Sequence, residues 1–237
     1  MTRLGIIAAL PAEQRTLSTR RIACGGWIRL TDNTLLALSG AGPERAAAAG
    51  RRLIEEGINA LLSWGCAAGL DSALAPGALV LPETLIAADG RAHNVDPTWH
   101  QRLHRCLSEC LVVHTGSVVE SRHLVVEATE KAALFERFRG IALDMESVAI
   151  AQLAAGKGIP FVIIRTIADP ANSNLPQSVA RALDSRGNVD LRKLFSYTLV
   201  HPAEFGRLLQ LGWHFCAARR TLKRVVKQTG SDFLVPS

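Results

Sequence analysis

Short apolar runs alternate with amphipathic segments along the first two thirds of the chain. Buried strands are expected at the apolar runs, which span residues 4–9, 60–63, 78–81, 111–113, 141–143 and 161–164. Segments 27–31 and 35–38 flank an Asp32-Asn33 turn signal and predict a hairpin. Helices are expected over 43–56, 101–110, 128–137 and 146–156. The pattern predicts an α/β fold with a mixed central sheet flanked by helices.

From Asp190 onward the pattern becomes that of helices. Apolar residues recur there at spacings of three and four and therefore share one helical face: Leu208, Leu211, Phe215, Ala218, Leu222 and Val225. We expect a catalytic domain over residues 1–200. Residues 201–237 are expected to form a basic amphipathic C-terminal helix and tail, a helical appendage that belongs to the same unit.

Composition places the chain among ordinary globular proteins. Of the 237 residues, 48% are hydrophobic and 20% are charged, which excludes disorder. The net charge of +6 is concentrated after His201, where basic residues outnumber acidic ones. Aromatic residues make up only 5% and no basic-aromatic motif occurs, so a nucleic acid partner is not expected.

The cysteines and the lengths of the apolar runs indicate where in the cell the protein is expected. The five cysteines are an odd number without a C-x-x-C pair, so free thiols are expected and neither a disulfide framework nor a metal site is. No apolar run approaches the roughly 20 residues that span a bilayer, and the first residues lack the pattern of a signal peptide. A cytoplasmic location is expected.

Candidate ligand-binding segments follow several predicted strands, where open α/β sheets bind their ligands. Glu13 follows the first strand, and a lone glutamate there is most often a solvated residue at a helix start. The turn at 40–45 feeds a helix N-terminus that could hold an anion. This turn fails as a dinucleotide motif because Arg45 takes the third glycine position. Taken singly, Glu146 could be a helix-start carboxylate and Asp169 a turn residue.

Taken together, these segments resemble a known family. The residues that carry the resemblance are the strand before Glu13, Gly40-Ala41-Gly42, Gly65-Cys66-Ala67-Ala68-Gly69-Leu70, Asp144-Met145-Glu146-Ser147 and Ile164-Arg165-Thr166-Ile167-Ala168-Asp169. Over roughly residues 3 to 200 the sequence is similar to the nucleoside phosphorylase and nucleosidase superfamily, with its three-layer fold. That superfamily includes purine nucleoside phosphorylases and methylthioadenosine/S-adenosylhomocysteine nucleosidases. Segments 63–71, 87–91 and 142–147 and the basic tail resemble the hopanoid-associated phosphorylases most closely.

The resemblance implies roles for individual residues in cleaving an N-glycosidic bond, which needs an acid for the leaving base, an anchor for the sugar and a nucleophile. Asp169 would protonate N7 of adenine, and Glu13 would orient the attacking water. Glu146 would accept the ribose hydroxyls, with Met145 packed on the sugar. The remaining substrate-binding positions implied are Asp144, Cys66, Ala67 and Gly42. The resemblance implies no cofactor.

The nucleophile is either water or phosphate. Hexameric phosphorylases of the family carry an Arg shortly before a Gly-Ser turn. Leu62-Ser63-Trp64 occupies that stretch here and Cys66 replaces the Ser, so the phosphate site is altered. Since Glu13 is present, the sequence favours hydrolysis. Gly42, Arg45 and Cys66 would hold phosphate as a co-substrate if the reaction were phosphorolytic.

Two departures concern the base pocket and the acidic motif. Asp144 stands where many relatives have Glu, and the stacking aromatic of the methylthioadenosine nucleosidases is replaced by Arg122-His123-Leu124-Val125. We expect Leu124 or Val125 to pack on the base. His123 is expected at the surface or in packing, with ligand contact as the alternative.

The resemblance implies an adenine nucleoside as substrate, and adenosylhopane, a lipid-linked one, as its identity. The basic helix would then touch the inner face of the membrane through Trp213 and Phe215, or instead pack on the protein's own core. A homo-oligomer is expected from the family. The alternatives are a methylthioadenosine/S-adenosylhomocysteine nucleosidase, a purine nucleoside phosphorylase and a non-catalytic adenosine-binding module.

Overall fold

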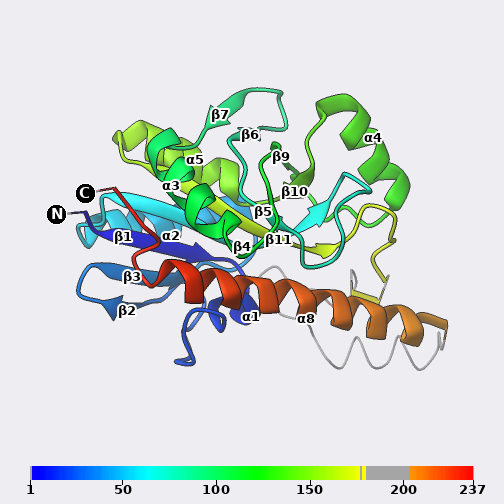
Figure 1. Ribbon diagram of the computed structural model, residues 1–237, viewed down its shortest axis with the longest axis horizontal. Coiled ribbons are helices and arrows are strands. Elements are labelled where there is room, and N and C mark those ends of the chain that lie inside the picture. Colours follow the sequence, from blue (N-terminus) through cyan, green and yellow to red (C-terminus); the bar gives the residue numbers. More distant parts are fainter. Residues whose placement is uncertain (1, 177, 180–202, 237) are drawn as a thin grey trace.

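A computed structural model describes residues 2–176, 178–179 and 203–236 of the protein (Figure 1). Its strands are β1 (Leu4–Ala8), β2 (Trp27–Thr31), β3 (Thr34–Leu38), β4 (Ala60–Gly69), β5 (Leu79–Val80), β6 (Thr84–Ile86), β7 (Ala92–Asn94), β8 (Val113–His114), β9 (Val118–Glu120), β10 (Ala142–Asp144) and β11 (Phe161–Asp169). Its helices are α1 (Pro11–Gln14), α2 (Pro43–Glu55), α3 (Pro97–Ser108), α4 (Ala128–Phe138), α5 (Ser147–Lys157) and α8 (Ala203–Thr229).

The strands form one mixed sheet with β4 at its centre. The main order is β2-β3-β1-β4-β10-β9-β6-β7, and β11 pairs with β4 and β5. β1 and β11 run parallel to β4, whereas β10 meets the end of β4 in antiparallel register at Ala68 and Gly69. The predicted mixed α/β sheet is confirmed. Its centre is a single long strand on which three others converge.

β4 and β11 are longer than the apolar runs indicate. The expected strands end at residues 63 and 164, whereas the observed strands continue to Gly69 and Asp169. The sequence predicted that the segments 63–69 and 165–169 follow strands. In the structure they lie inside strands. Small residues carry little strand propensity, but backbone pairing of β4 with β11 on one edge and β10 on the other holds them extended.

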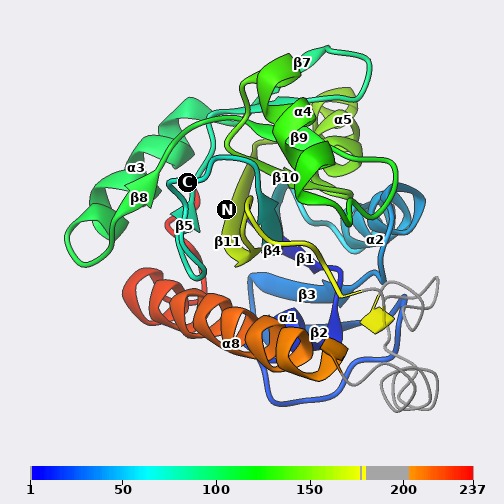
Figure 2. The same ribbon diagram turned by 90° about the vertical axis from the view of Figure 1, so that its right-hand side faces the viewer.

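Helices cover the central strands from two sides (Figure 2). α2 and α5 pack against each other and on β1 and β4, while α8 crosses β11 and α3 packs on α8. Gly50 allows the close approach of α2 to α5, because a Cβ atom there would lie 2.6 Å from Leu153 Cδ2. Short elements at α1, β6, β7 and β9 have no counterpart in the expected pattern.

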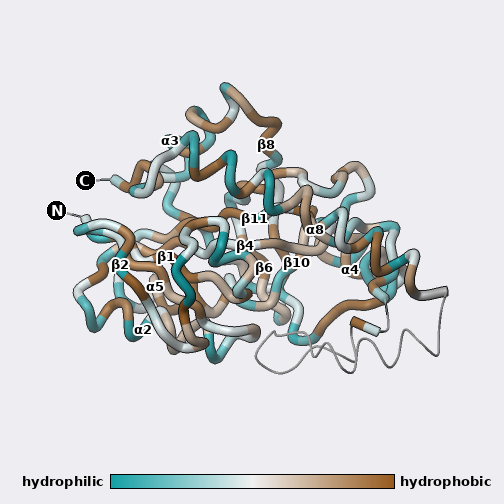
Figure 3. The backbone as a smooth tube through the Cα atoms, turned by 90° about the horizontal axis from the view of Figure 1, so that it is seen from below, coloured by the Kyte–Doolittle hydropathy of each residue, from teal (hydrophilic) through white to brown (hydrophobic). Residues whose placement is uncertain are grey.

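The C-terminal helix α8 buries part of the face that its periodicity predicts. Ala218, Leu222 and Val225 are fully buried, whereas Leu208, Leu211 and Phe215 are only partly so. Helix α8 carries hydrophobic and hydrophilic residues along its whole length (Figure 3). In the part of the chain that the structure describes, no helix is long and apolar enough to span a bilayer.

The segment after α8 returns to the core next to β4. Phe233 is completely buried, and its ring meets that of Trp64 edge-on with 5.2 Å between centroids. Trp99 donates its indole N–H to the Phe233 carbonyl at 2.6 Å. Thr2 reaches the Pro236 carbonyl at 2.6 Å, so the two ends of the chain lie side by side.

Truncation of Phe233 tests whether the C-terminal segment folds as one unit with the sheet. Phe233→Ala should lower the free energy of unfolding by about 3–5 kcal/mol, because it empties a fully enclosed aromatic site. Denaturant unfolding should remain a single transition. Leu209→Ala on the exposed side of α8 is the control and should stay within about 0.5 kcal/mol. Two separate transitions would show that residues 203–236 are an independent unit.

Candidate active site

A buried ion pair joins three strands at the centre of the site. Arg165 on β11 donates its Nε–H to Asp144 Oδ2 at 2.8 Å, at the end of β10. A terminal nitrogen of the same guanidinium lies 2.7 Å from Ser63 Oγ on β4 and 2.8 Å from Ser147 Oγ, the first residue of α5. Ser147 Oγ in turn donates to Asp144 Oδ2. Both charges are hydrogen-bonded, so this network fixes the end of β10 and the middle of β11 against β4.

Glu13 lies directly above the backbone of β4. Its carboxylate accepts the N–H of Cys66 at 2.8 Å and the N–H groups of Leu10 and Ala9 at 2.9 and 3.2 Å. Gly65 makes room for it, since a Cβ atom there would lie 2.5 Å from Glu13 Oε1. Burial raises the pKa of Glu13, while the Arg165 charge and the three N–H groups oppose the rise.

Glu146 connects the start of α5 with the glycine turn before α2. Its Oε1 accepts the N–H of Gly42 at 2.8 Å. Gly42 has a φ of 104°, which other residues rarely adopt, so the turn that aims this N–H requires glycine. Burial raises the pKa of Glu146 to about 7, the Asp144 charge adds to the rise, and the Gly42 N–H and the Arg165 charge oppose it. Oε2 has no protein partner within the described residues.

Asp169 ends β11 beside an open pocket. In the strand register it lies opposite Ala68 of β4, past a bulge. The pocket has a volume of about 260 Å³ and is lined by Asp169, Asn172, Ser173, Asn174, Pro176, Arg207, Gln210 and Leu211. Lys131 of α4 pairs with Asp169 Oδ2 at 2.7 Å. Burial raises the pKa of Asp169, and the charges of Lys131 and His214 oppose the rise.

Cys66 and Ala67 lie in β4 beneath Glu13. Cys66 is partly exposed and its Sγ lies 3.8 Å from Thr166 Oγ1. Burial raises the pKa of the Cys66 thiol and the Glu13 charge adds to the rise, while the Arg165 and Arg219 charges oppose it. The thiol therefore stays protonated at neutral pH and is a polar contact, not a nucleophile. Ala67 is buried.

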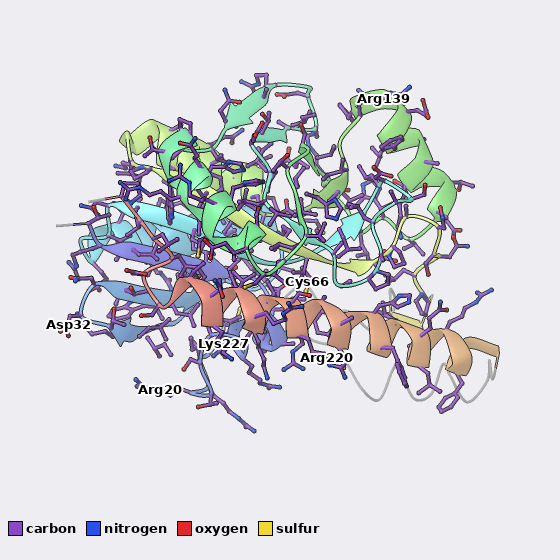
Figure 4. The ribbon with its side chains drawn as sticks, in the orientation of Figure 1. Arg20, Asp32, Cys66, Arg139, Arg220 and Lys227 are labelled. Atoms are coloured by element: carbon purple, nitrogen blue, oxygen red, sulfur yellow. The ribbon has the colours of Figure 1, made fainter. Side chains whose placement is uncertain are left out.

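Helix α8 contributes two cationic residues to this region. Arg219 interacts electrostatically with Cys66, and His214 does so with Asp169. Arg219 Nε is buried and has no hydrogen-bond partner among the described residues. Cys66 lies next to the middle of α8 in Figure 4, while Arg220 and Lys227 extend from the opposite side of the helix.

The other expected positions differ in their exposure. Met145 is partly exposed between Asp144 and Glu146, and Arg45 is a partly exposed residue in the first turn of α2. Val125 is buried in a small apolar cluster that includes Leu143, whereas Leu124 is 38% exposed. His123 is exposed, as the sequence predicts, and its Nε2 lies 2.7 Å from Glu130 Oε1. The described residues contain no cluster of His, Cys, Asp or Glu that could hold a metal ion.

Arg165 and Lys131 are among the residues of the site that were missing from the predicted set. Arg165 could have been predicted from the sequence, because a lone arginine inside the apolar run of a central strand needs a buried partner. No feature of the sequence identifies Lys131, since a lysine in an amphipathic helix is ordinarily solvated. Its burial depends on the chain after β11 folding back over α4.

Comparison with solved structures identifies the same fold in two nucleosidases and a futalosine hydrolase. A putative 5′-methylthioadenosine/S-adenosylhomocysteine nucleosidase from Francisella philomiragia is 19% identical, with a TM-score of 0.71 over 97% of this chain and 99% of that one. The corresponding nucleosidase from Neisseria meningitidis is 21% identical, with a TM-score of 0.68 over 96% and 99%. Futalosine hydrolase from Helicobacter pylori is 16% identical, with a TM-score of 0.69 over 95% and 97%.

The sequence itself matches a family model. The model of the phosphorylase superfamily aligns with residues 13–192, which include Glu13, the glycine turn, the centre of β4 and the ends of β10 and β11. This match covers well over half of the chain. The protein therefore belongs to the phosphorylase superfamily, whose members cleave the N-glycosidic bonds of nucleosides.

Proposed function

We propose that the protein hydrolyses the N-glycosidic bond of an adenine nucleoside and releases adenine. The observation that carries the proposal is the position of Glu13 on the backbone of Gly65 and Cys66. That part of β4 pairs with the end of β11, so Glu13 and Asp169 lie over neighbouring positions of the same strand pair. The paired strands β4 and β11 thus position a base for water, which the Cys66 N–H holds, and an acid for the leaving base, which ends β11.

The surroundings of each carboxyl group suggest a separate role for it in the reaction. Asp169 lines the pocket and its pKa is raised, as an acid for adenine N7 requires. Glu13 keeps one lone-pair direction beyond its three N–H donors, which suffices to orient a water molecule. Glu146 Oε2, which has no partner among the described residues, would accept the ribose hydroxyls. Asp144 would act through Arg165, which it holds in place.

Phosphorolysis is the second candidate, and Arg219 is the observation that favours it. The buried Nε of Arg219, which has no partner in the described part of the chain, could hold an anion near Cys66. Arg165 is less suited to phosphate, because Asp144, Ser63, Ser147 and the Ile164 carbonyl already occupy its donors. Hydrolysis therefore remains the proposal, with Arg45, Gly42 and Cys66 as further phosphate contacts in the alternative.

Adenine release in phosphate-free buffer tests the reaction. The wild-type protein should release adenine without phosphate. Glu13→Gln should lower kcat by roughly 10²–10⁴-fold, because the base for water is lost. Asp169→Asn should cause a similar loss while a non-cleavable C-nucleoside still binds. Mass spectrometry of adenine and of the sugar product measures both.

Three outcomes of this assay would contradict the proposal. Strict dependence on phosphate, with a sugar phosphate as product, would establish phosphorolysis, and Arg219→Met should then weaken the dependence. Binding of the C-nucleoside without any adenine release would indicate a non-catalytic adenosine-binding module. Glu13→Gln with full activity would remove Glu13 from the mechanism.

The ionisation of Glu146 should control binding of the sugar. Because burial raises its pKa to about 7, Glu146 is largely protonated below pH 7 and accepts hydrogen bonds poorly. Affinity for the C-nucleoside should therefore fall toward about tenfold per pH unit as the pH drops below 7. Calorimetric titration at pH 5 to 8 measures this.

Glu146→Gln provides the matched variant. The amide oxygen can still accept the Gly42 N–H, so the fold is retained, while the charge is lost. Affinity at pH 8 should fall by about 10–100-fold, and its pH dependence should flatten. Ionising a carboxyl whose folded-state pKa is raised destabilises the fold as the pH rises, so thermal unfolding at pH 8 should show the variant at least as stable as wild type. An unchanged pH dependence would assign the titration to another group.

For the 5′-substituent we propose a lipid, with adenosylhopane as the candidate. The support is an exposed stripe on α8, defined as Phe205, Leu209 and Trp213, which are 59, 52 and 77% exposed. Helical geometry places these three residues on one face of α8. Further along the helix, the same face carries the exposed basic residues Arg220, Lys223, Arg224 and Lys227. Phe215 lies on a different face and is partly buried. An apolar stripe that continues into basic residues suits an anionic membrane surface.

Vesicle binding tests this stripe. The wild-type protein should co-sediment with vesicles of phosphatidylglycerol and phosphatidylcholine at low salt, and less so at high salt because the basic residues are screened. The double variant Leu209→Ser, Trp213→Ser should lose at least about half of the bound fraction. Val112→Ser removes a 76% exposed apolar side chain elsewhere and is the control.

Failure to co-sediment at low salt would contradict membrane contact. A homo-oligomer that dissociates in the double variant, measured by light scattering, would assign the stripe to a second copy of the chain. Faster adenine release from methylthioadenosine than from the adenosyl lipid would favour the thioether nucleosidase.

A further inference from the structure

Lys131 is a fully buried lysine that the reaction outlined above does not use. Among the residues of α4, all of which the structure describes, it is the only buried one, although the helix also carries Leu134, Phe135 and Phe138. Its side chain has no exposed area. A lysine occupies such a position only when its ammonium group is fully paired, so its partners define its role.

The ammonium group of Lys131 uses its three donors on the last residue of β11 and on the loop that follows. Nζ lies 2.7 Å from Asp169 Oδ2, 3.0 Å from the Pro170 carbonyl and 2.8 Å from the Ser173 carbonyl. One oxygen of Asp169 is therefore held. No protein partner is recorded for Oδ1 within the described residues, and Asp169 lines the open pocket.

Further bonds tie the same loop to the start of α4. Ala128 donates its N–H to Asn174 Oδ1 at 2.7 Å, and Leu175 donates its N–H to the Val126 carbonyl at 2.8 Å. The wall of the pocket formed by residues 172–174 is thus fastened to the helix that carries Lys131. A change at Lys131 would move the carboxyl group relative to whatever occupies the pocket.

We propose that Lys131 is a positioning residue of the reaction, which holds one carboxyl oxygen of Asp169 so that the other meets the leaving base, and which sets the pH range over which Asp169 carries a proton. This inference rests on the proposed function, because it takes Asp169 as the acid. Without the ammonium charge, the effect of burial on Asp169 would be opposed less strongly, so the carboxyl group would stay protonated to higher pH.

Other charged groups face Asp169 as well. His214 and Arg207 reach it from α8, His214 through its charge and Arg207 as part of the pocket wall. Arg165 is the other charged residue of β11, and it is committed to Asp144. Lys131 is the only one of these in direct contact with the Asp169 carboxylate among the described residues. His214→Gln therefore serves to separate the histidine contribution from that of the lysine.

Carboxyl ¹³C NMR of Asp169, assigned by its disappearance in Asp169→Asn, tests the proposal without requiring turnover. In Lys131→Met the Asp169 titration should move to higher pH, whereas in Lys131→Arg, which keeps the charge, it should stay near that of wild type. Lys157→Met, at the exposed end of α5, is the matched control and should leave the titration unchanged.

Kinetics provide the second readout. Lys131→Met should lower kcat by about 100-fold through misplacement of the acid, with KM within about threefold of wild type. Lys131→Arg should lower kcat as well, because its longer side chain misplaces the carboxyl group while preserving its titration. If Lys131→Met does not fold, the Arg variant carries the test on its own.

Two results would overturn the proposal. One is an Asp169 titration in folded Lys131→Met that matches wild type, and the other is full kcat in either folded Lys131 variant. Absence of nucleoside cleavage by the wild-type protein would instead refute the proposed function, while the NMR titrations would still decide whether Lys131 sets the charge of Asp169.

Discussion

The ion pair between Arg165 and Asp144 is the interaction on which the site depends. It is buried in the middle of the sheet, where the removal of two charges from water costs several kcal/mol per ion unless hydrogen bonds compensate. Ser63 and Ser147 supply that compensation from β4 and α5. The pair therefore brings four elements to one point. Glu146 follows Asp144 at the start of α5, Asp169 ends the strand that carries Arg165, and the Arg165 charge acts on Glu13.

Burial acts on all three outer carboxyl groups, and their neighbours differentiate them. Glu13 is compensated by three backbone N–H groups, Asp169 by a buried lysine, and Glu146 mainly by one N–H from the glycine turn. Groups with the same chemistry can thereby serve as base, acid and anchor. The fold supports this arrangement through small residues, since Gly65 admits Glu13 and Gly42 turns its N–H toward Glu146.

Much of this could be predicted from the sequence, and the failures have physical causes. Apolar runs located the main strands, but the small residues of segment 63–69 concealed the length of β4, which depends on pairing. The order of Glu13, Glu146 and Asp169 indicated a common site. Lys131 could not be found because its partners lie about 40 residues away in sequence and meet it only through the fold. Periodicity showed that α8 is amphipathic, yet only packing shows which apolar residues stay exposed.

A crystal structure with a non-cleavable adenine C-nucleoside would test the central claim most directly. The account predicts the base in the pocket beside Asp169, with N7 in hydrogen-bond reach of Oδ1, and the ribose hydroxyls on Glu146 Oε2. It also predicts a water molecule between Glu13 and the anomeric carbon. A nucleoside bound elsewhere, or one whose ribose does not touch Glu146, would contradict the account.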